Sequence, residues 1–248
     1  MAGRRVTRRL VSRDQWQALL ASPPPSDARE PATRRGRMPI SRQRIIDAAL
    51  VVVASGGYEQ LTMRSVADAL DTGPASLYQH VRDKSELGDL LVSELCSRVA
   101  LPEVDPSRWR EQFVDVCVAL RDQFLAYPGV AAVALAAVPA DLGPLRLQEA
   151  LFSLLLAGGA DPQDAAWTTD AAHLYVIAYC LEASAASEQA VRVPEETIDP
   201  AEIAARLRML PLEQFPNTVR HADLLTSGAG HERFDFTLER MLRNLGHG

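Results

Sequence analysis

The chain has 248 residues, of which 47% are hydrophobic and 23% charged, and its formal net charge is −6. This composition excludes wholesale disorder and suits one or two globular domains, and the absence of any run of about 18 apolar residues excludes a membrane span and a membrane partner. The three scattered cysteines and a basic N-terminus without an apolar segment behind it indicate a reducing, cytoplasmic protein and not a secreted one.

The N-terminal part of the chain is strongly basic. Residues 1–44 contain eleven arginines and three acidic residues, whereas the rest of the chain contains 15 basic and 29 acidic residues. Residues 1–39 are predicted to be a largely flexible extension, with a short basic helix allowed between Arg4 and Leu20 and a proline-rich linker behind it. The charge favours contact with a polyanion such as double-stranded DNA, along its backbone or in a minor groove. A disordered tail without a partner, or a misplaced start codon, would give the same pattern.

Residues 40–99 are predicted to form a small helical domain. Apolar residues recur at helical spacing, with Ser41 as an N-cap and Gly56 at the first stop. We expect helices over 41–56, 62–70, 74–80 and 84–99. The first three form a three-helix helix-turn-helix domain, with the helix-turn-helix itself at about 62–81.

Residues 103–246 are predicted to form a larger helical domain. We expect its helices over 107–127, 130–138, 142–157, 162–189, 201–210 and 234–245, with a loop over about 211–230. No segment shows the period-two alternation of a β-strand, and no internal repeat is present. The predicted fold class is therefore all-α.

The segment 62–81 carries the functional prediction. Its apolar residues form the inner faces of the two helices, which leaves a small polar set on the outer side of the second helix: Pro74, Ala75, Ser76, Tyr78, Gln79 and His80. A recognition helix presents this part to base edges in the major groove. Arg64 and Lys84 flank it and are placed to reach phosphates or a base. The alternative is an ordinary pair of short helices in an α-helical enzyme or scaffold.

Two strings in this segment are distinctive: Thr62-x-Arg64-x-Val66-Ala67 and Ser76-Leu77-Tyr78-x-His80-Val81-x-Asp83-Lys84-x-x-Leu87. Together they resemble the DNA-binding domain of TetR-type transcriptional regulators. The resemblance implies a DNA-binding set that also includes Thr62. Within it, Tyr78, His80 and Lys84 would contact phosphates, whereas bases or the adjacent backbone would be contacted by Arg64, Pro74, Ala75, Ser76 and Gln79. Asp71 replaces a glycine that the family often has in the turn, and we expect it to adopt the positive φ required there.

The C-terminal domain resembles that of the tetracycline repressor more loosely. The segments Leu174–Glu182 and Phe234–Leu242 look like its dimerisation helices, although an internal core seam would show the same spacing. A single helix-turn-helix contacts only a few base pairs, so function also favours a homodimer whose two recognition helices reach half-sites about 34–36 Å apart.

The resemblance also implies a pocket for a small-molecule effector in the C-terminal domain. Its candidate lining residues are Phe113, Cys117, Phe124, Phe152, Trp167, His173, Tyr175 and Tyr179. Aromatic residues at helical spacing also fill ordinary cores, which is the alternative for each of them. We predict no cofactor and no metal, because the histidines and acidic residues do not have the spacing of a ligand set.

No catalytic motif is present, so the chain is not expected to be an enzyme. The sequence predicts a ligand-responsive DNA-binding transcriptional regulator. The resemblance implies a repressor, because repression is the usual mode of that family. It would bind a palindromic operator as a homodimer and be released by a small molecule. The alternative is a helical small-molecule-binding or scaffold protein without DNA-binding activity.

Overall fold

A computed structural model of the chain describes residues 13–21, 39–137, 141–192 and 199–246. Every regular element in these ranges is a helix, which confirms the predicted all-α class. None of these helices combines the length and the apolarity that a membrane crossing requires. A helix is present in the basic extension as α1 (Arg13–Ala21), and the rest of residues 1–38 lies outside the described ranges.

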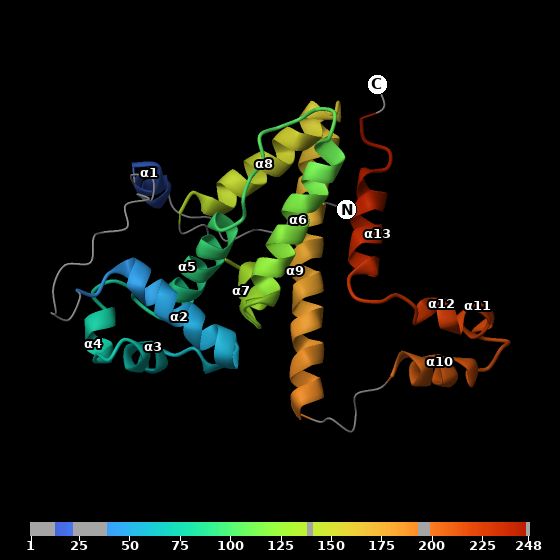
Figure 1. Cartoon of the computed structure of the whole chain (residues 1–248), viewed down its shortest axis with the longest axis horizontal. Helices are drawn as coiled ribbons and strands as arrows, with labels where there is room; N and C mark the ends of the chain where they lie inside the picture. The colour runs from blue at the N-terminus through green and yellow to red at the C-terminus, as the bar shows by residue number, and fades with distance from the viewer. Residues whose placement is uncertain (1–12, 22–38, 138–140, 193–198, 247–248) are drawn as a thin grey trace, which may run out of the picture.

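The N-terminal bundle lies at one side of the molecule (Figure 1), and its buried apolar residues belong to the same core as those of the body. Its elements are α2 (Arg42–Gly56), η1 (Tyr58–Gln60), α3 (Met63–Ala69) and α4 (Pro74–Leu77), and α5 (Lys84–Ser97) leads from it into the rest of the molecule. Ser41 caps α2, because its hydroxyl accepts a hydrogen bond from the backbone N of Arg44. Serine is one of the residues preferred at this position. Ile45, Val66 and Leu77 are completely buried, so the apolar spacing that predicts the helices also fills the core.

The body of the protein consists of helices grouped around the 31-residue α9. Its elements are α6 (Trp109–Leu125), α7 (Val130–Ala134), α8 (Gly143–Ala157), α9 (Pro162–Arg192) and α13 (Glu232–Leu242). The long α9 packs against α6 and α8, while α5 packs on α2 and also on α7 and α8. Helix α5 therefore joins the N-terminal bundle to the body (Figure 1).

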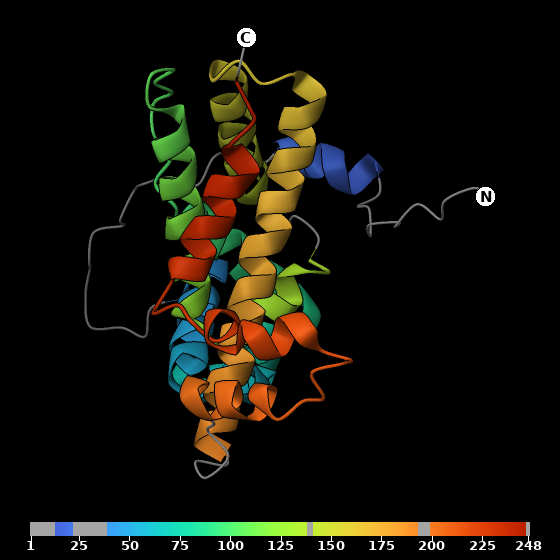
Figure 2. The same ribbon diagram turned by 90° about the vertical axis from the view of Figure 1, so that its right-hand side faces the viewer.

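Three short helices between α9 and α13 stand to one side of the body. They are α10 (Pro200–Arg208), α11 (Pro216–Arg220) and α12 (Ala222–Leu225). Figure 1 shows them beside the lower half of α9, and Figure 2, seen from that side, shows them in front of it. The prediction of a loop over 211–230 is therefore partly wrong, because α11 and α12 lie within it. Helices of five and four residues are too short for a helical period to show in the sequence.

The second helix of the helix-turn-helix is also shorter than expected. The sequence predicts it to continue to about His80, whereas α4 ends at Leu77. The backbone N atoms of His80 and Val81 both donate to the carbonyl of Leu77, at 2.9 and 3.0 Å, so the segment closes as a turn. Helix α5 starts shortly after this turn, at Lys84. Asp83 is its N-cap and accepts a hydrogen bond from the backbone N of Glu86.

The turn between α3 and α4 contains a residue in the left-handed region. Asp71 has a φ of +51°, the only positive value at a non-glycine residue in the described chain. This confirms the expectation that aspartate replaces the usual glycine in that conformation. The turn is closed by a hydrogen bond from the backbone N of Thr72 to the carbonyl of Ala67, at 2.9 Å.

Replacing Asp71 by valine is expected to lower the free energy of unfolding by about 1–2 kcal/mol, because a β-branched side chain is strongly disfavoured in the left-handed region. Asp71→Asn is the matched control and is expected to stay within about 0.5 kcal/mol of the parent protein. Urea unfolding followed by circular dichroism measures both variants. Equal stabilities would show that the turn does not need the left-handed conformation.

Candidate nucleic-acid interface

The start of α3 is held by a reciprocal pair of hydrogen bonds. Thr62 Oγ1 accepts from the backbone N of Ser65, and Ser65 Oγ accepts from the backbone N of Thr62, both at 2.9 Å. This capping box satisfies two backbone donors and fixes the first turn of α3, which carries the exposed Arg64. The hydroxyl of Thr62, a predicted DNA-binding residue, is therefore already engaged within the protein.

Helix α4 is anchored on its inner side and exposed on its outer side. Leu77 is completely buried, whereas Pro74 and Ala75 are exposed. Pro74 occupies the first helical position, where its missing N–H costs no hydrogen bond. Ser76 is half-buried, and its hydroxyl accepts a hydrogen bond from Thr72 Oγ1 at 3.3 Å.

Another group of predicted DNA-binding residues has side chains without a partner among the described residues. In the part of the chain that the structure describes, no hydrogen bond or ion pair involves the side chains of Arg64, Tyr78, Gln79 and His80. Tyr78 is 55% exposed, which is high for a large aromatic side chain. A free guanidinium, phenol, amide and imidazole are the groups that proteins use to contact phosphates and base edges.

Lys84 differs from this group. Its Nζ donates to the backbone carbonyl of Tyr58 at 3.2 Å and lies 4.6 Å from the centre of the Tyr58 ring. An ammonium has three donors, so a phosphate contact would add to a bond that Lys84 already makes inside the protein. Tyr58 is not among the residues predicted from the sequence. The signal available was an aromatic residue directly after the helix-ending pair Gly56-Gly57.

Other basic side chains of the N-terminal bundle are paired with acidic neighbours. Arg42 and Arg82 both bind Glu86, at 2.8 and 3.0 Å, and Arg98 binds Glu94 at 2.9 Å. Partial burial opposes ionisation of Glu86, but the hydrogen bonds and charges of the two arginines lower its pKa overall. The surface around α4 therefore carries less unpaired positive charge than the number of arginines suggests.

The residues predicted to line an effector pocket lie in different environments. Phe113, Cys117 and Phe124 are completely buried on α6, and Phe152 is half-buried on α8. Trp167, on α9, is 67% exposed and is not brought together with the other aromatic residues.

The remaining predicted pocket residues lie on α9. Tyr175 and Tyr179 pack on Phe234 of α13, with ring centres 5.5 and 4.9 Å apart. The Tyr179 hydroxyl is also hydrogen-bonded to Nδ1 of His231 at 2.8 Å. These two tyrosines connect α9 to α13, whereas His173 is half-buried elsewhere along α9.

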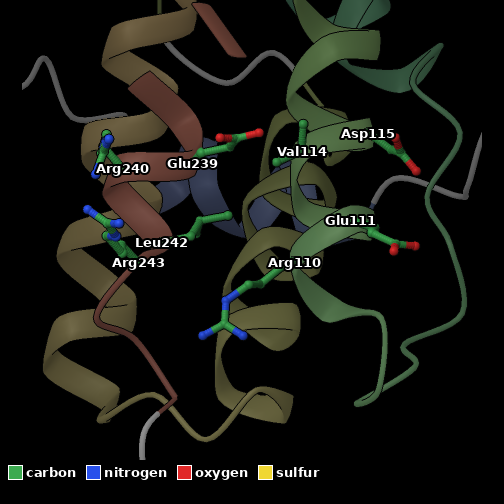
Figure 3. Close-up of a pocket in the computed structure, with 8 residues that line it drawn as sticks. All are labelled: Arg110, Glu111, Val114, Asp115, Glu239, Arg240, Leu242 and Arg243. Atoms are coloured by element: carbon green, nitrogen blue, oxygen red, sulfur yellow. The ribbon is translucent and has the colours of Figure 1, made fainter. Parts of the chain in front are cut away.

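An open groove of about 670 Å³ lies at a different place, between α6 and α13. Figure 3 shows the residues that line it: Arg110, Glu111, Val114, Asp115, Glu239, Arg240, Leu242 and Arg243. None of the predicted pocket residues is among them. The groove therefore does not coincide with the predicted effector pocket.

The cysteines do not form a reactive site. Cys96, Cys117 and Cys180 are all buried, and burial raises the pKa of each thiol to about 12. They stay protonated at neutral pH and are poor nucleophiles. Among the described residues, no three histidine, cysteine or acidic side chains are grouped closely enough to hold a metal ion.

An exposed recognition segment on a tight turn, carried by a small helical bundle and joined to a larger helical body, defines a helix-turn-helix transcriptional regulator. Residues 45–89 match the model of bacterial regulatory proteins of the tetR family, and residues 101–246 match that of the tetracyclin repressor-like C-terminal domain. The chain belongs to the TetR family.

Individual relatives agree with this assignment. ActR from Streptomyces coelicolor, solved in complex with actinorhodin, has a TM-score of 0.72 and 34% identity over 83% of this chain and 94% of ActR. The class D tetracycline repressor protein of Escherichia coli is 27% identical over 208 residues, which are 82% of this chain and 88% of that protein. An HTH-type transcriptional regulator of Saccharopolyspora erythraea is 29% identical over 169 residues, 68% of this chain and 70% of its own.

The function follows from the family. The chain is a ligand-responsive DNA-binding transcriptional repressor that acts as a homodimer. The predicted arrangement of an N-terminal helix-turn-helix domain and a larger helical C-terminal domain is confirmed. A scaffold without DNA binding is not favoured. Regulators of this family are in general transcription factors and not enzymes.

Proposed function

We propose that each protomer places α4 in the major groove of one half-site of a palindromic operator. In this proposal residues 40–99 are the DNA-binding domain, and residues 103–246 bind the effector and the second protomer. One observation carries it: the exposed side chains of Arg64, Tyr78 and Gln79 have no partner in the described part of the chain. A twofold pair of such surfaces suits half-sites about 34–36 Å apart.

The residues proposed to contact DNA form two groups, one for phosphates and one for base edges. Tyr78, His80 and Lys84 are proposed to bind phosphates, which sets the register without selecting a sequence. Gln79 and Arg64 are proposed to contact base edges, because an amide and a guanidinium each form paired hydrogen bonds with purines.

Small residues complete the proposed interface at the start of α4. Pro74 and Ala75 are exposed and short, so they let the helix approach the bases closely. The hydroxyls of Ser76 and Thr62 are already bonded within the protein, so these residues are proposed to contact DNA mainly through their position at the surface.

Gln79→Ala is expected to weaken operator binding by about 1–3 kcal/mol and to relax the base preference at one position of each half-site. Tyr78→Phe removes only a hydroxyl and is expected to weaken binding to all sequences to a similar extent. Arg220→Ala, at an exposed arginine of α11, is the control. Footprinting upstream of the gene locates the operator, and fluorescence anisotropy gives the dissociation constants. An unchanged base preference in Gln79→Ala would contradict the assignment of that residue.

The arginine-rich extension is proposed to supply much of the attraction to DNA. Residues 41–99 contain six basic and eight acidic side chains, and several of the basic ones are paired within the protein. Residues 1–39 contain nine arginines against three acidic residues. A basic segment next to a nearly neutral recognition surface can bind the phosphate backbone or a minor groove.

Removing residues 1–39 is expected to lower operator affinity several-fold and to flatten its salt dependence, because arginine–phosphate contacts release counterions. A full-length variant with the nine arginines of this segment replaced by glutamine separates charge from length and should behave like the deletion. Binding isotherms at several salt concentrations measure both. An unchanged dissociation constant and salt slope would show that the extension does not contact DNA.

The dimer interface is proposed on the exposed sides of α9 and α13, including the predicted segments Leu174–Glu182 and Phe234–Leu242. Trp167 and Leu174 on α9 and Phe236 on α13 are large apolar side chains that the protomer leaves exposed. The two helices pack against each other and lie on one face of the body (Figure 2). A second protomer on this face would remove that apolar surface from water.

Leu174→Glu is expected to shift the protein towards monomers at micromolar concentration, because an unpaired carboxylate is costly to bury in an interface. Leu156→Glu is the matched control, since Leu156 is a part-exposed leucine on α8, outside the proposed interface. Light scattering coupled to size exclusion measures the mass of each. If both variants have the mass of a dimer, the interface does not include this part of α9.

The effector is proposed to be a small organic molecule bound in the body near the predicted residues of α6, α8 and α9. It releases DNA only if it binds the DNA-incompetent arrangement more tightly than the competent one. Binding of DNA and of this molecule accounts for the role without catalysis, so we propose no enzymatic activity. We further propose that the protein acts in the cytoplasm, where bacterial DNA lies.

A further inference from the structure

The N-terminal bundle touches the body at a second place besides α5. Tyr58, in η1, donates from its backbone N to the carbonyl of Pro128 at 2.9 Å. Pro128 lies in the loop between α6 and α7. Tyr58 is followed almost at once by Thr62, the N-cap of α3, so this bond joins the body to the start of the helix-turn-helix.

The same residue also holds the start of α5. Lys84 Nζ donates to the carbonyl of Tyr58 at 3.2 Å, and the Tyr58 hydroxyl donates to the carbonyl of Lys84 at 3.5 Å. The ammonium lies 4.6 Å from the centre of the ring, within the range of a cation–π interaction. Burial, with smaller effects of Asp89 and Glu59, raises the pKa of Tyr58, so the phenol stays a neutral donor.

Two glycines make room for the tyrosine. A Cβ added at Gly88 of α5 would lie 2.7 Å from the Tyr58 hydroxyl oxygen, and one added at Gly129 would lie 2.9 Å from Tyr58 Cβ. Both distances are too short for any real side chain. Tyr58 is therefore enclosed by α5 on one side and by the α6–α7 loop on the other.

The α6–α7 loop has a further link to α5 and α2. The hydroxyl of Tyr127 accepts a hydrogen bond from Nη1 of Arg98 at 3.0 Å. Arg98 in turn pairs with Glu94 on its own helix at 2.9 Å and lies 3.9 Å from Asp47 of α2. Adjacent residues of one loop thus contact η1 of the N-terminal bundle and the C-terminal end of α5.

We infer that Tyr58 is a positioning residue that sets the orientation of the recognition helix relative to the body. It acts through a contact that we call the Tyr58 junction, made of Tyr58, Lys84, Gly88, Pro128 and Gly129. A single helix leaves the bundle free to tilt and rotate about it, whereas a second attachment removes that freedom. A displacement of the α6–α7 loop then moves the helix-turn-helix directly, and not only by bending α5. The inference deepens the proposed function, because the consequence for DNA affinity rests on α4 binding the operator.

The test measures the distance between the N-terminal bundle and the body within one protomer. Spin labels at Asp68→Cys on α3 and Arg146→Cys on α8, both exposed positions, report it by double electron–electron resonance. Doubly labelled protein is diluted into an excess of unlabelled protein, so the distance belongs to one protomer whether or not the chain dimerises. The three native cysteines are buried, with the pKa of each thiol raised to about 12, and should escape labelling.

Three variants probe the junction. Gly129→Ala forces a methyl group against Tyr58 and replaces none of the residues proposed to contact DNA. Gly230→Ala is the matched control, because this glycine also has a positive φ but has no atom within 4 Å of an added Cβ. Tyr58→Phe keeps the ring and the backbone bond and should behave like the parent protein. If Gly129→Ala fails to fold, as thermal unfolding would show, Tyr58→Ala takes its place.

The expected result is a broadened or shifted distance distribution for Gly129→Ala alone. Its operator affinity should fall about tenfold if the competent orientation is populated about a tenth of the time. A distribution as narrow as that of Gly230→Ala in the folded protein would overturn the inference, and so would a broadened distribution with unchanged affinity. If the parent protein itself binds no operator, the proposed function fails, while the distance measurement still decides whether the Tyr58 junction orients the bundle.

Discussion

The DNA-facing surface depends on the burial of one leucine. Helix α4 has four residues, and a helix this short has no stability of its own in water, because nucleation is costly and too few hydrogen bonds follow it. Leu77 is completely buried against a core that includes Val66 and Ala67 of α3. Burial of a leucine side chain contributes about 1.5–3 kcal/mol, enough to hold a single turn in place. The outward direction of Tyr78 and Gln79 follows from that anchor.

The basic side chains have two different roles: some form ion pairs within the protein, and others are available to bind DNA. Arg42 and Arg82 share Glu86, and Arg98 pairs with Glu94, so the charge of these arginines is engaged within the fold, and the Arg42–Glu86 pair joins α2 to α5. A protein with a net charge of −6 must still approach a polyanion. The unpaired Arg64 and the basic N-terminal extension are the parts of the chain whose charge is suited to that role.

The connection between the two parts of the molecule shapes how regulation can work. Helix α5 carries the covalent link, and its inner face is packed on both the N-terminal bundle and the body. Tyr58 adds a contact from the bundle to the α6–α7 loop, next to α7, which packs on α5 and α9. A ligand that changes how α7 packs on α9 would therefore act on the bundle through packed contacts. The shift in DNA affinity is limited by the difference in the ligand's affinity for the two arrangements.

The amino-acid sequence by itself determined the features that depend on neighbouring residues. Apolar spacing and caps such as Ser41 locate the helices, and Asp71 marks a turn whose positive φ the structure confirms. The recognition segment was predicted from the same local signals together with a distinctive string around Tyr78. These features are readable because hydrogen bonds and side-chain preferences within a few residues decide them.

Only the tertiary structure decided what distant segments do to one another. The early end of α4 depends on how the chain must turn to start α5, and the four- and five-residue helices α12 and α11 have too few residues for a period to show. Lys84 lies against Tyr58, and Tyr58 against Pro128, because the fold brings together residues far apart along the chain. Trp167 lies at the surface while Phe113 is buried, although both are aromatic residues on regular helices. Helical spacing defines a face, but only packing shows which faces meet another helix and which are left for a partner.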